Sequence, residues 1–287
     1  AASSSSTIAI LIHLLFCFNA LLLQCSLSRG ITLESVRDFL TREEDTIVFS
    51  LIERAKYPYN SPLYNPSSCL KVDKWFGNSC SLVELFVRDS ERVQAKIGSY
   101  QNPEEVPFFP EDLTWPVVPP YNFSKVLYPA AASVNVSDTI WSVYFKELLP
   151  QFTVEGVDGN FASTAASDLA CLQALSRRIH YGRFVAEVKF RDSPQDYIPA
   201  IRAKDRDALM KLVTSESQEE IVKKRVEEKA AVFGQDVTLD RPADTGDSNS
   251  SRAAYKVDPS VVYRLYGDWV IPLTKIVEIE YLLRRLD

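Results

Sequence analysis

The chain has 287 residues, of which 46% are hydrophobic and 24% charged, and its formal net charge is −6. This composition is typical of a globular protein with one large or two small domains, and the acidic balance disfavours nonspecific binding to nucleic acid. Because the chain has only 9 glycines and 2 histidines and no glycine-rich phosphate motif, we expect neither a dinucleotide or P-loop fold nor a histidine-rich metal centre.

An uncharged leader occupies residues 1–28, with a nearly continuous apolar run from Ile8 to Leu23. The run is short for a membrane span, which needs about 20 residues, but it suits a signal peptide with small residues at 26–28 for cleavage. No Lys or Arg precedes it. The leader therefore suggests the secretory pathway, the cytoplasm remains the alternative, and no stable membrane span is expected once the leader is removed.

Helical spacing of apolar residues dominates the rest of the chain, with capping residues or prolines at the helix ends. Thr32 is a predicted N-cap, Ser217 and Glu220 form a predicted capping box, and Pro272 is expected to kink or divide the last helix. Five predicted helices have both ends: from Thr32 to before Pro58, from Ser81 to Ile97, from Ser137 to Leu149, from a cap at Ser163 to about Phe190, and from Ser217 to before Gly234. For three more the sequence gives only a start, at Pro194, Asp205 and Pro259.

Two segments break the helical pattern. Residues 101–129 hold seven prolines, which excludes a long helix and predicts an extended connection. Its aromatic residues suggest that it lies against the core. Residues 235–254 are polar without periodicity, which predicts a mobile surface loop. Strand signals are weak, so the sequence predicts an all-α, single-domain, multi-helix fold over residues 31–287, after the leader. The aromatic residues of the connection are Phe108, Phe109, Trp115 and Tyr121.

The cysteines carry no metal-binding spacing. Two of the five, Cys17 and Cys25, lie in the leader, and no C-x-x-C motif occurs. We expect the others to be buried free thiols, with a disulfide between Cys69 and Cys80 as the alternative in an oxidising compartment.

Several charged residues lie on or beside apolar helix faces. Arg178 and Lys189 are three helical turns apart and should project from one face, where Gly182 and Val185 are expected to leave open space between them. Thr274 and Glu278 are i,i+4 neighbours on the last helix, and Arg37 lies beside apolar positions of the first. Each residue alone fits a solvated face or a structural ion pair; together they supply the parts needed to bind a small dicarboxylate.

Longer runs of sequence resemble a known family. The segment Leu172–Phe190, with Arg177-Arg178-Ile179-His180-Tyr181-Gly182-Arg183 at its centre, resembles the eukaryotic all-helical (AroQ-type) chorismate mutases. So do Ile271-Pro272-Leu273-Thr274-Lys275, Glu280 to Leu286, Arg42 to Phe49 and Pro107-Phe108-Phe109-Pro110. The resemblance extends from about Leu33 to Asp287, and it is to plant enzymes above all, especially the isoform without a plastid transit peptide.

The resemblance implies an isomerase that converts chorismate to prephenate on the route to Phe and Tyr. It implies a homodimer, and a reaction that needs no cofactor and no metal. Arg37 and Arg178 are expected to bind the two substrate carboxylates, because a guanidinium suits bidentate contact. Lys189 is expected to donate to the ether oxygen, and Glu278, when protonated, to donate to the same oxygen.

Three further positions carry over less directly. Thr274 is expected to support the carboxylate end of the substrate, and Glu219 to accept from its hydroxyl group. Ser215 stands where relatives carry an amide or aromatic residue, so its contact with substrate departs from the family pattern. A catalytically inactive binding protein on the same fold and an enzyme acting on another dicarboxylate are the alternatives.

The family also has an effector site at the dimer interface, where Tyr inhibits and Trp activates. Responsive relatives carry glycine before the serine of a run that here reads Asn160-Phe161-Ala162-Ser163, and a basic residue after Gly98, where this chain has Ser99. The resemblance therefore predicts a degenerate effector site and absent or weak feedback.

Overall fold

A computed structural model describes residues 31–66, 80–123, 125–235 and 255–287 of the chain. Within these ranges the secondary structure is helical, apart from one isolated antiparallel bridge between Gln235 and Tyr255. The predicted all-α fold is confirmed. The predicted leader, Cys69 and residues 236–254 of the predicted loop lie outside the described ranges.

The helices follow one another with short connections except around the proline-rich segment. Single turns of 3-10 helix are η1 (Ser61–Leu63), η3 (Pro110–Asp112) and η4 (Pro129–Ala131), and π-helical segments are η5 (Tyr144–Leu148) and η6 (Tyr266–Val270). The α-helices are α2 (Leu33–Arg54), α3 (Leu82–Lys96), α4 (Ser137–Val143), α5 (Leu149–Phe152), α6 (Phe161–His180), α7 (Gly182–Asp192), α8 (Pro194–Arg202), α9 (Arg206–Val213), α10 (Glu216–Phe233), α11 (Pro259–Leu265) and α12 (Ile271–Leu283).

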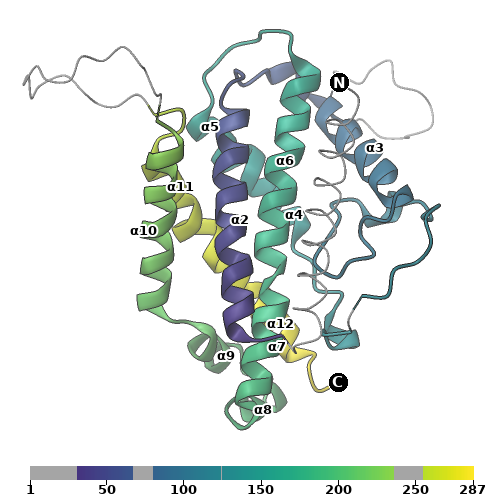
Figure 1. The fold of residues 1–287 in the computed structure, drawn as a ribbon, viewed down its shortest axis with the longest axis vertical. Helices are drawn as coiled ribbons and strands as arrows, with labels where there is room; N and C mark the ends of the chain where they lie inside the picture. Colours follow the sequence, from purple (N-terminus) through teal and green to yellow (C-terminus); the bar gives the residue numbers. More distant parts are fainter. Residues whose placement is uncertain (1–30, 67–79, 124, 236–254) are drawn as a thin grey trace, which may run out of the picture.

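The two long helices α2 and α6 lie side by side at the centre of the molecule (Figure 1). They run antiparallel, because Arg54 at the end of α2 bonds Asp168 in α6, while Glu43 meets Arg177 nearer the end of α6. Helix α10 packs along α2, and α3 and α4 pack on α6. Helices α7, α8 and α9 gather at one end of the molecule against α12 (Figure 1).

Both π-helical segments precede a proline at the same spacing. Pro150 is the second residue after η5, and Pro272 is the second residue after η6. Proline has no amide hydrogen to donate and its ring crowds the carbonyl four residues earlier, so the preceding turn widens to the i→i+5 pattern. The last helical stretch is divided into α11 and α12 as predicted, but the π-helical segment η6 joins them without a gap and Pro272 lies in the first turn of α12. The helix predicted to end at Leu149 instead continues through Pro150 to Phe152.

The helix starts follow most of the predicted caps. The side chain of Thr32 accepts from the amide of Ser35 and caps α2, and Asp205 caps α9 in the same way. The capping box at Ser217 is wrong: α10 starts two residues earlier, with Ser215 at the N-cap position. The start predicted at Ser163 is also late, because α6 begins at Phe161 and Ser163 lies inside its first turn.

The proline-rich connection lies on the core over only part of its length. Phe108 is buried, and Phe109 packs beside it against Trp141. The carboxylate of Glu91 on α3 accepts from the amides of both phenylalanines, at 2.8 and 2.9 Å, and so satisfies donors that have no helical partner. The expectation is wrong for Trp115, which is 91% exposed. Tyr121 is exposed too.

The apolar core forms two clusters, and the boundary between them falls at the end of α6 and within α12. Ile179 on α6 and Val277 on α12 belong to the first cluster, which α2, α6 and α11 dominate. Tyr181 and Ile279, each two residues further along its chain segment, belong to the second, to which α7, α12 and α8 contribute most. Side chains near this boundary lie between two apolar clusters. No helix in the described ranges combines the length and apolar composition needed to cross a bilayer.

Candidate active site

Arg178 lies at the boundary between the two core clusters, near the end of α6. It is only 5% exposed, and its Nη1 donates to Thr274 Oγ1 of α12 at 3.4 Å. Its guanidinium carbon lies 5.8 Å from the ring centroid of Tyr266. Its Nε has no hydrogen-bond partner, and no carboxylate within the described ranges forms an ion pair with it. The charge of Arg178 acts on the carboxyl groups of Glu278 and Glu43 without a direct ion pair to either, so the guanidinium keeps hydrogen-bonding capacity that an anionic ligand could use.

Lys189 reaches the same region from α7. Its Nζ donates to Glu278 Oε2 of α12 at 2.9 Å and to the carbonyl of Val213, at the end of α9, at 3.1 Å. The Lys189 side chain is 25% exposed and that of Glu278 is 5% exposed. The ammonium group is therefore held by two fixed acceptors and retains an open side from which a ligand can contact it.

The carboxyl group of Glu278 has a raised pKa. Burial disfavours its ionised form and raises the pKa, while the neighbouring charges of Lys189, Arg178 and Lys275 act in the opposite direction. The net direction is upward, toward the form that carries a proton and can donate a hydrogen bond.

Gly182 has a different role from the one that the sequence suggests. A Cβ atom at this position would stand 2.8 Å from the carbonyl oxygen of Thr274 and 3.1 Å from its Cγ2. The expected open space between Arg178 and Lys189 is therefore wrong at Gly182, because α12 fills it. The missing side chain lets α7 and α12 approach closely, which brings Thr274 and Glu278 to the two cations.

Glu219 and Ser215 lie at the start of α10. Lys275, next to Thr274 on α12, donates to both carboxylate oxygens of Glu219, at 3.0 and 3.1 Å. This ion pair connects Glu219 to the cluster. Ser215 is exposed and its side chain makes no capping bond. It follows Val213, whose carbonyl bonds Lys189, so the chain places Ser215 near the cluster without a contact to it.

Arg37 is exposed, and no hydrogen bond or ion pair of the described residues joins its side chain to the other predicted site residues. The position of Arg37 along the bundle follows from α2 and α10, which run parallel. Arg225 of α10 bonds Glu44 of α2, and nearer the C-terminal ends of the same two helices Phe233 stacks on Phe49. Arg37 lies two turns below Glu44, and the start of α10 lies at a similar depth below Arg225. The helices therefore bring Arg37 to the level of the cluster.

Tyr266 and Lys275 were not identified as site residues from the sequence. The Tyr266 hydroxyl is buried, has no hydrogen-bond partner and belongs to the ring that faces Arg178. Its position eight residues before Thr274 on one helical face is the signal that could have indicated it. No group of three His, Cys, Asp or Glu side chains within the described ranges is arranged to hold a metal ion.

The predicted effector residues form two separate groups in one chain. Gly98, with a positive φ of 102°, ends α3, and the amide of Ser99 bonds the carbonyl of Gln94, whose side chain accepts from Gln173 of α6. Residues 160–163, which include Asn160, Ala162 and Ser163, open α6 about 15 Å from Gln173 along the helix. One chain therefore does not bring the two groups together.

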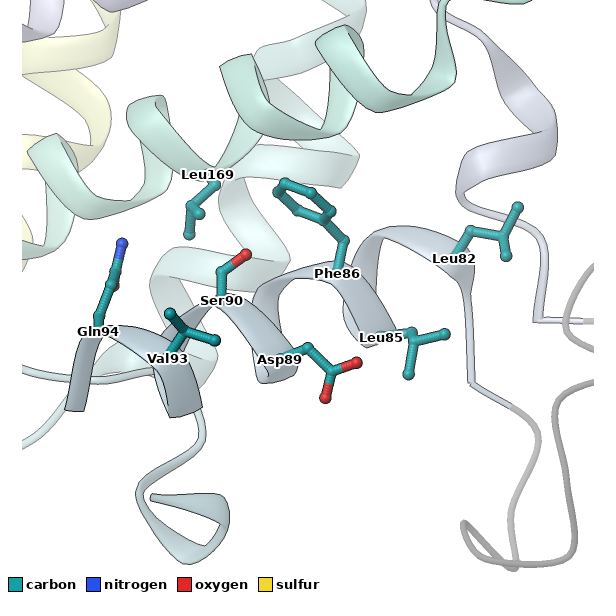
Figure 2. A pocket seen from close by; sticks show the side chains of 8 residues that line it. All are labelled: Leu82, Leu85, Phe86, Asp89, Ser90, Val93, Gln94 and Leu169. Carbon is teal, nitrogen blue, oxygen red and sulfur yellow. The ribbon is translucent and has the colours of Figure 1, made fainter. Parts of the chain in front are cut away.

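A shallow groove on α3 and α6 lies away from the cluster (Figure 2). Asp89 is its only charged residue, and no cation lines it. The groove therefore lacks the groups needed to bind a dicarboxylate. The remaining lining residues are Leu82, Leu85, Phe86, Ser90, Val93, Gln94 and Leu169.

The chain is similar to known enzymes over nearly its whole length. Residues 160–279 match the family described as Chorismate mutase type II. Chorismate mutase 2 of Arabidopsis thaliana is 59% identical over 260 residues, which cover 91% of this chain and 95% of that protein. The cytosolic chorismate mutase 2 of Zea mays is 55% identical over 257 residues, covering 90% and 97%.

Solved structures agree with these matches. The crystal structure of AtCM1 with tyrosine bound in its allosteric site is 47% identical, covers 91% of this chain and 98% of its own, and superposes with a TM-score of 0.77. The chain belongs to the chorismate mutase type II family.

Proposed function

We propose that Arg178, Lys189, Thr274 and Glu278 form the active site at which this chain, as a chorismate mutase, converts chorismate to prephenate. The observation that carries the assignment is Arg178: a buried guanidinium with an unpartnered Nε and no direct ion pair within the described ranges, beside a second cation and a carboxyl group with a raised pKa. An enzyme for a dicarboxylate needs such a group, whereas a helical scaffold without activity gains nothing from it.

The reaction is an intramolecular rearrangement in which the ether C–O bond breaks while a C–C bond forms. No atom is gained or lost, so the site has to fix the reactive conformation and stabilise the negative charge that develops on the ether oxygen. Arg178 binds one carboxylate and Arg37 the other. Arg37, Arg178, Lys189 and Lys275 outnumber the carboxyl groups near them, those of Glu219, Glu278 and Glu43, which suits a substrate with two negative charges.

Two donors act on the ether oxygen. The ammonium group of Lys189 is held by the carbonyl of Val213 and by Glu278, which accepts from it in the structure; once protonated, Glu278 can donate to the ether oxygen from α12. Glu219 accepts from the substrate hydroxyl, and Ser215 contributes less than the amide or aromatic residue that relatives carry there. The first test is the loss of chorismate absorbance on adding the purified protein. Unchanged absorbance at saturating chorismate would contradict the proposal.

We expect activity to depend on pH through Glu278. Burial raises the pKa of this carboxyl group, and only its protonated form donates, so the part of kcat that it supplies is present at low pH and falls as pH rises through its pKa in the site. Glu278→Gln places a permanent amide donor there. The variant is expected to lose much of the alkaline decline that the wild-type enzyme shows between about pH 5 and 9. Parallel profiles for the two proteins would contradict the donor role.

Feedback by aromatic amino acids is expected to be absent or weak. Ser99 supplies no charge for the carboxylate of an effector, and the Cβ of Ala162 occupies a place where glycine allows close approach. Initial rates at subsaturating chorismate with millimolar Tyr, Phe or Trp should change less than about twofold. The double variant Ser99→Arg with Ala162→Gly restores both features, and a gain of response in it would support the explanation. A severalfold wild-type response would contradict it.

A homodimer fits the two separated groups of effector residues. Gly98 and Ser99 cannot meet residues 160–163 within one chain, so a site built from both groups requires a second copy. The exposed apolar groove beside them (Figure 2) is suited to that contact, because Val93 on its rim is 59% exposed. The particle mass from light scattering tests this assignment, and a monomeric mass at micromolar concentration would contradict it.

We assign the protein to the cytoplasm rather than to the secretory pathway that the leader suggests. The support is the Zea mays relative, which is named as cytosolic and is similar over 97% of its own length. A fluorescent fusion of the full-length chain tests the location, and fluorescence in the endoplasmic reticulum would favour the secretory pathway.

A further inference from the structure

Helices α7 and α12 share a second polar contact close to Lys189 and Glu278. Glu187 on α7 is completely buried, and the Tyr281 hydroxyl on α12 donates to its Oε2 at 2.6 Å. Arg285, just beyond the end of α12, donates from Nε to the same oxygen at 2.6 Å. Neither Glu187 nor Tyr281 belongs to the residues that we place against the substrate.

The Glu187 carboxylate is held on every side. Its Oε1 accepts from Arg191 Nε at 2.5 Å and from Arg285 Nη2 at 3.2 Å, so both oxygens have charged donors. Tyr281 is fully buried, and its oxygen also accepts from the amide of Tyr128 at 2.8 Å. A buried carboxylate is tolerated only with such partners. Four donors in fixed directions leave it one position, which makes Glu187 a rigid point of attachment for α12.

The place of the Glu187 contact on α7 and α12 determines which side chains it can hold in position. Residues two apart on a helix differ by about 200° around its axis, so Glu187 and Lys189 leave α7 on different sides, and yet both contact α12. Tyr281 follows Glu278 by three residues, on the same face of α12. At the other end of the pair, Gly182 lies against Thr274 with no room for a Cβ atom. On α12, Glu278 therefore lies between two tight contacts, at Thr274 and at Tyr281, and on α7 Lys189 lies two residues beyond Glu187.

We propose that Glu187 is a positioning residue: by holding Tyr281 and Arg285 it fixes α12 against α7 and keeps Glu278 and Lys189 directed at the same reacting oxygen. The inference rests on the proposed function of these two donors. Glu187 does not contact the substrate, but it maintains the geometry on which the rearrangement depends. Displacement of a catalytic group by about 1 Å can cost on the order of a hundredfold in rate.

The test uses Tyr281→Phe, which removes one hydroxyl, and keeps the ring and the arginine contacts of Glu187. We expect kcat to fall by about tenfold with KM changed less than about twofold, because the donors shift while Arg178 still binds the substrate. Glu187→Gln, which keeps an oxygen acceptor for Tyr281 but loses the charge that holds Arg285, is expected to act in the same direction. If Glu187→Gln does not fold, Tyr281→Phe alone decides.

The matched control is Tyr263→Phe. Tyr263 on α11 also donates to a carboxylate, that of Glu220, at 3.1 Å, and it lies outside the contact between α7 and α12. It should retain wild-type kcat. A purely structural role for Tyr281 would lower the melting temperature and leave kcat per folded molecule unchanged, which would overturn the inference. A wild-type enzyme that does not convert chorismate would instead contradict the proposed function.

The pH profile gives a second readout. Glu278 faces Lys189, Arg178 and Lys275, and the hydroxyl of Tyr197 on α8. Lys189 acts to lower the pKa of Glu278, so a looser contact between them should move the alkaline midpoint of kcat to higher pH in Tyr281→Phe. An unchanged midpoint together with an unchanged kcat would overturn the inference.

Discussion

Replacing Lys189 by alanine is expected to lower kcat more than a hundredfold while the fold is kept. In the proposed active site the ammonium group supplies a preorganised donor to the ether oxygen, and the loss of one such donor costs about 2.7–4 kcal/mol in transition-state stabilisation. In this chain the effect has a second part, because the lysine also orients Glu278 at 2.9 Å. Its removal leaves the carboxyl group without its nearest cation.

Steady-state kinetics with chorismate, beside a thermal melt of each variant, separates loss of chemistry from loss of fold. Lys224→Ala is the matched control, because Lys224 lies on α10 with a side chain that is 67% exposed, and it should keep wild-type turnover. If Lys189→Ala retains near-normal kcat with an unchanged melt, Lys189 is not the ether-oxygen donor and the central assignment of the active site is wrong.

Much of the cluster that we propose as the active site could be predicted because its members repeat at helical spacing. Arg178 and Lys189, three turns apart, do reach one region, and Thr274 and Glu278 on α12 meet them there. Spacing along one chain segment is a local property, and the sequence displays it directly. Which helix would face these residues depends on contacts between distant segments, and here the resemblance to the family supplied what spacing could not.

The parts that could not be predicted are those set by packing between helices. The missing side chain of Gly182 suggested open space beside α7. In the structure α12 occupies this space, because glycine has no Cβ atom to keep it away. Lys275 could have paired with Glu278, its neighbour on α12, but the packing of α10 gives it Glu219 instead. The carbonyl of Val213 carries no side-chain signal at all, although it holds Lys189.

The second large effect is expected at the far end of α2, in the stability of the fold. Arg54 and Asp168 form an ion pair at 2.6 Å in which both side chains are 0% exposed, and the hydroxyls of Tyr64 and Tyr144 also donate to the carboxylate. Burial alone would lower the pKa of Arg54, but Asp168 holds it above its ordinary value. Removing one partner of such a pair leaves a buried charge and typically costs about 3–5 kcal/mol.

Arg54→Leu is therefore expected to lower the free energy of unfolding in urea by about 3–5 kcal/mol at neutral pH. The nearby pair of Lys56 and Glu53 has the same 2.6 Å separation, but its side chains are 53% and 61% exposed, so Lys56→Ala should cost less than about 1 kcal/mol. The contrast isolates burial as the cause, and equal losses in the two variants would contradict it.

The stability that Arg54→Leu loses should depend on pH, and the direction of this dependence shows whether the charge on Asp168 causes the loss. Burial raises the pKa of Asp168 in the folded state even beside Arg54, whose charge acts to lower it, so removal of the guanidinium raises this pKa further above its value in the unfolded chain. Folding of the variant is then favoured while Asp168 is protonated, and stability is lost as pH rises through that folded-state pKa. The difference in the free energy of unfolding between wild type and Arg54→Leu should therefore become smaller as pH falls from neutral toward about 5, and larger again when the pH is brought back to neutral. A deficit that stays constant over this range would mean that lost packing of the long Arg54 side chain, rather than the uncompensated carboxylate, accounts for the instability.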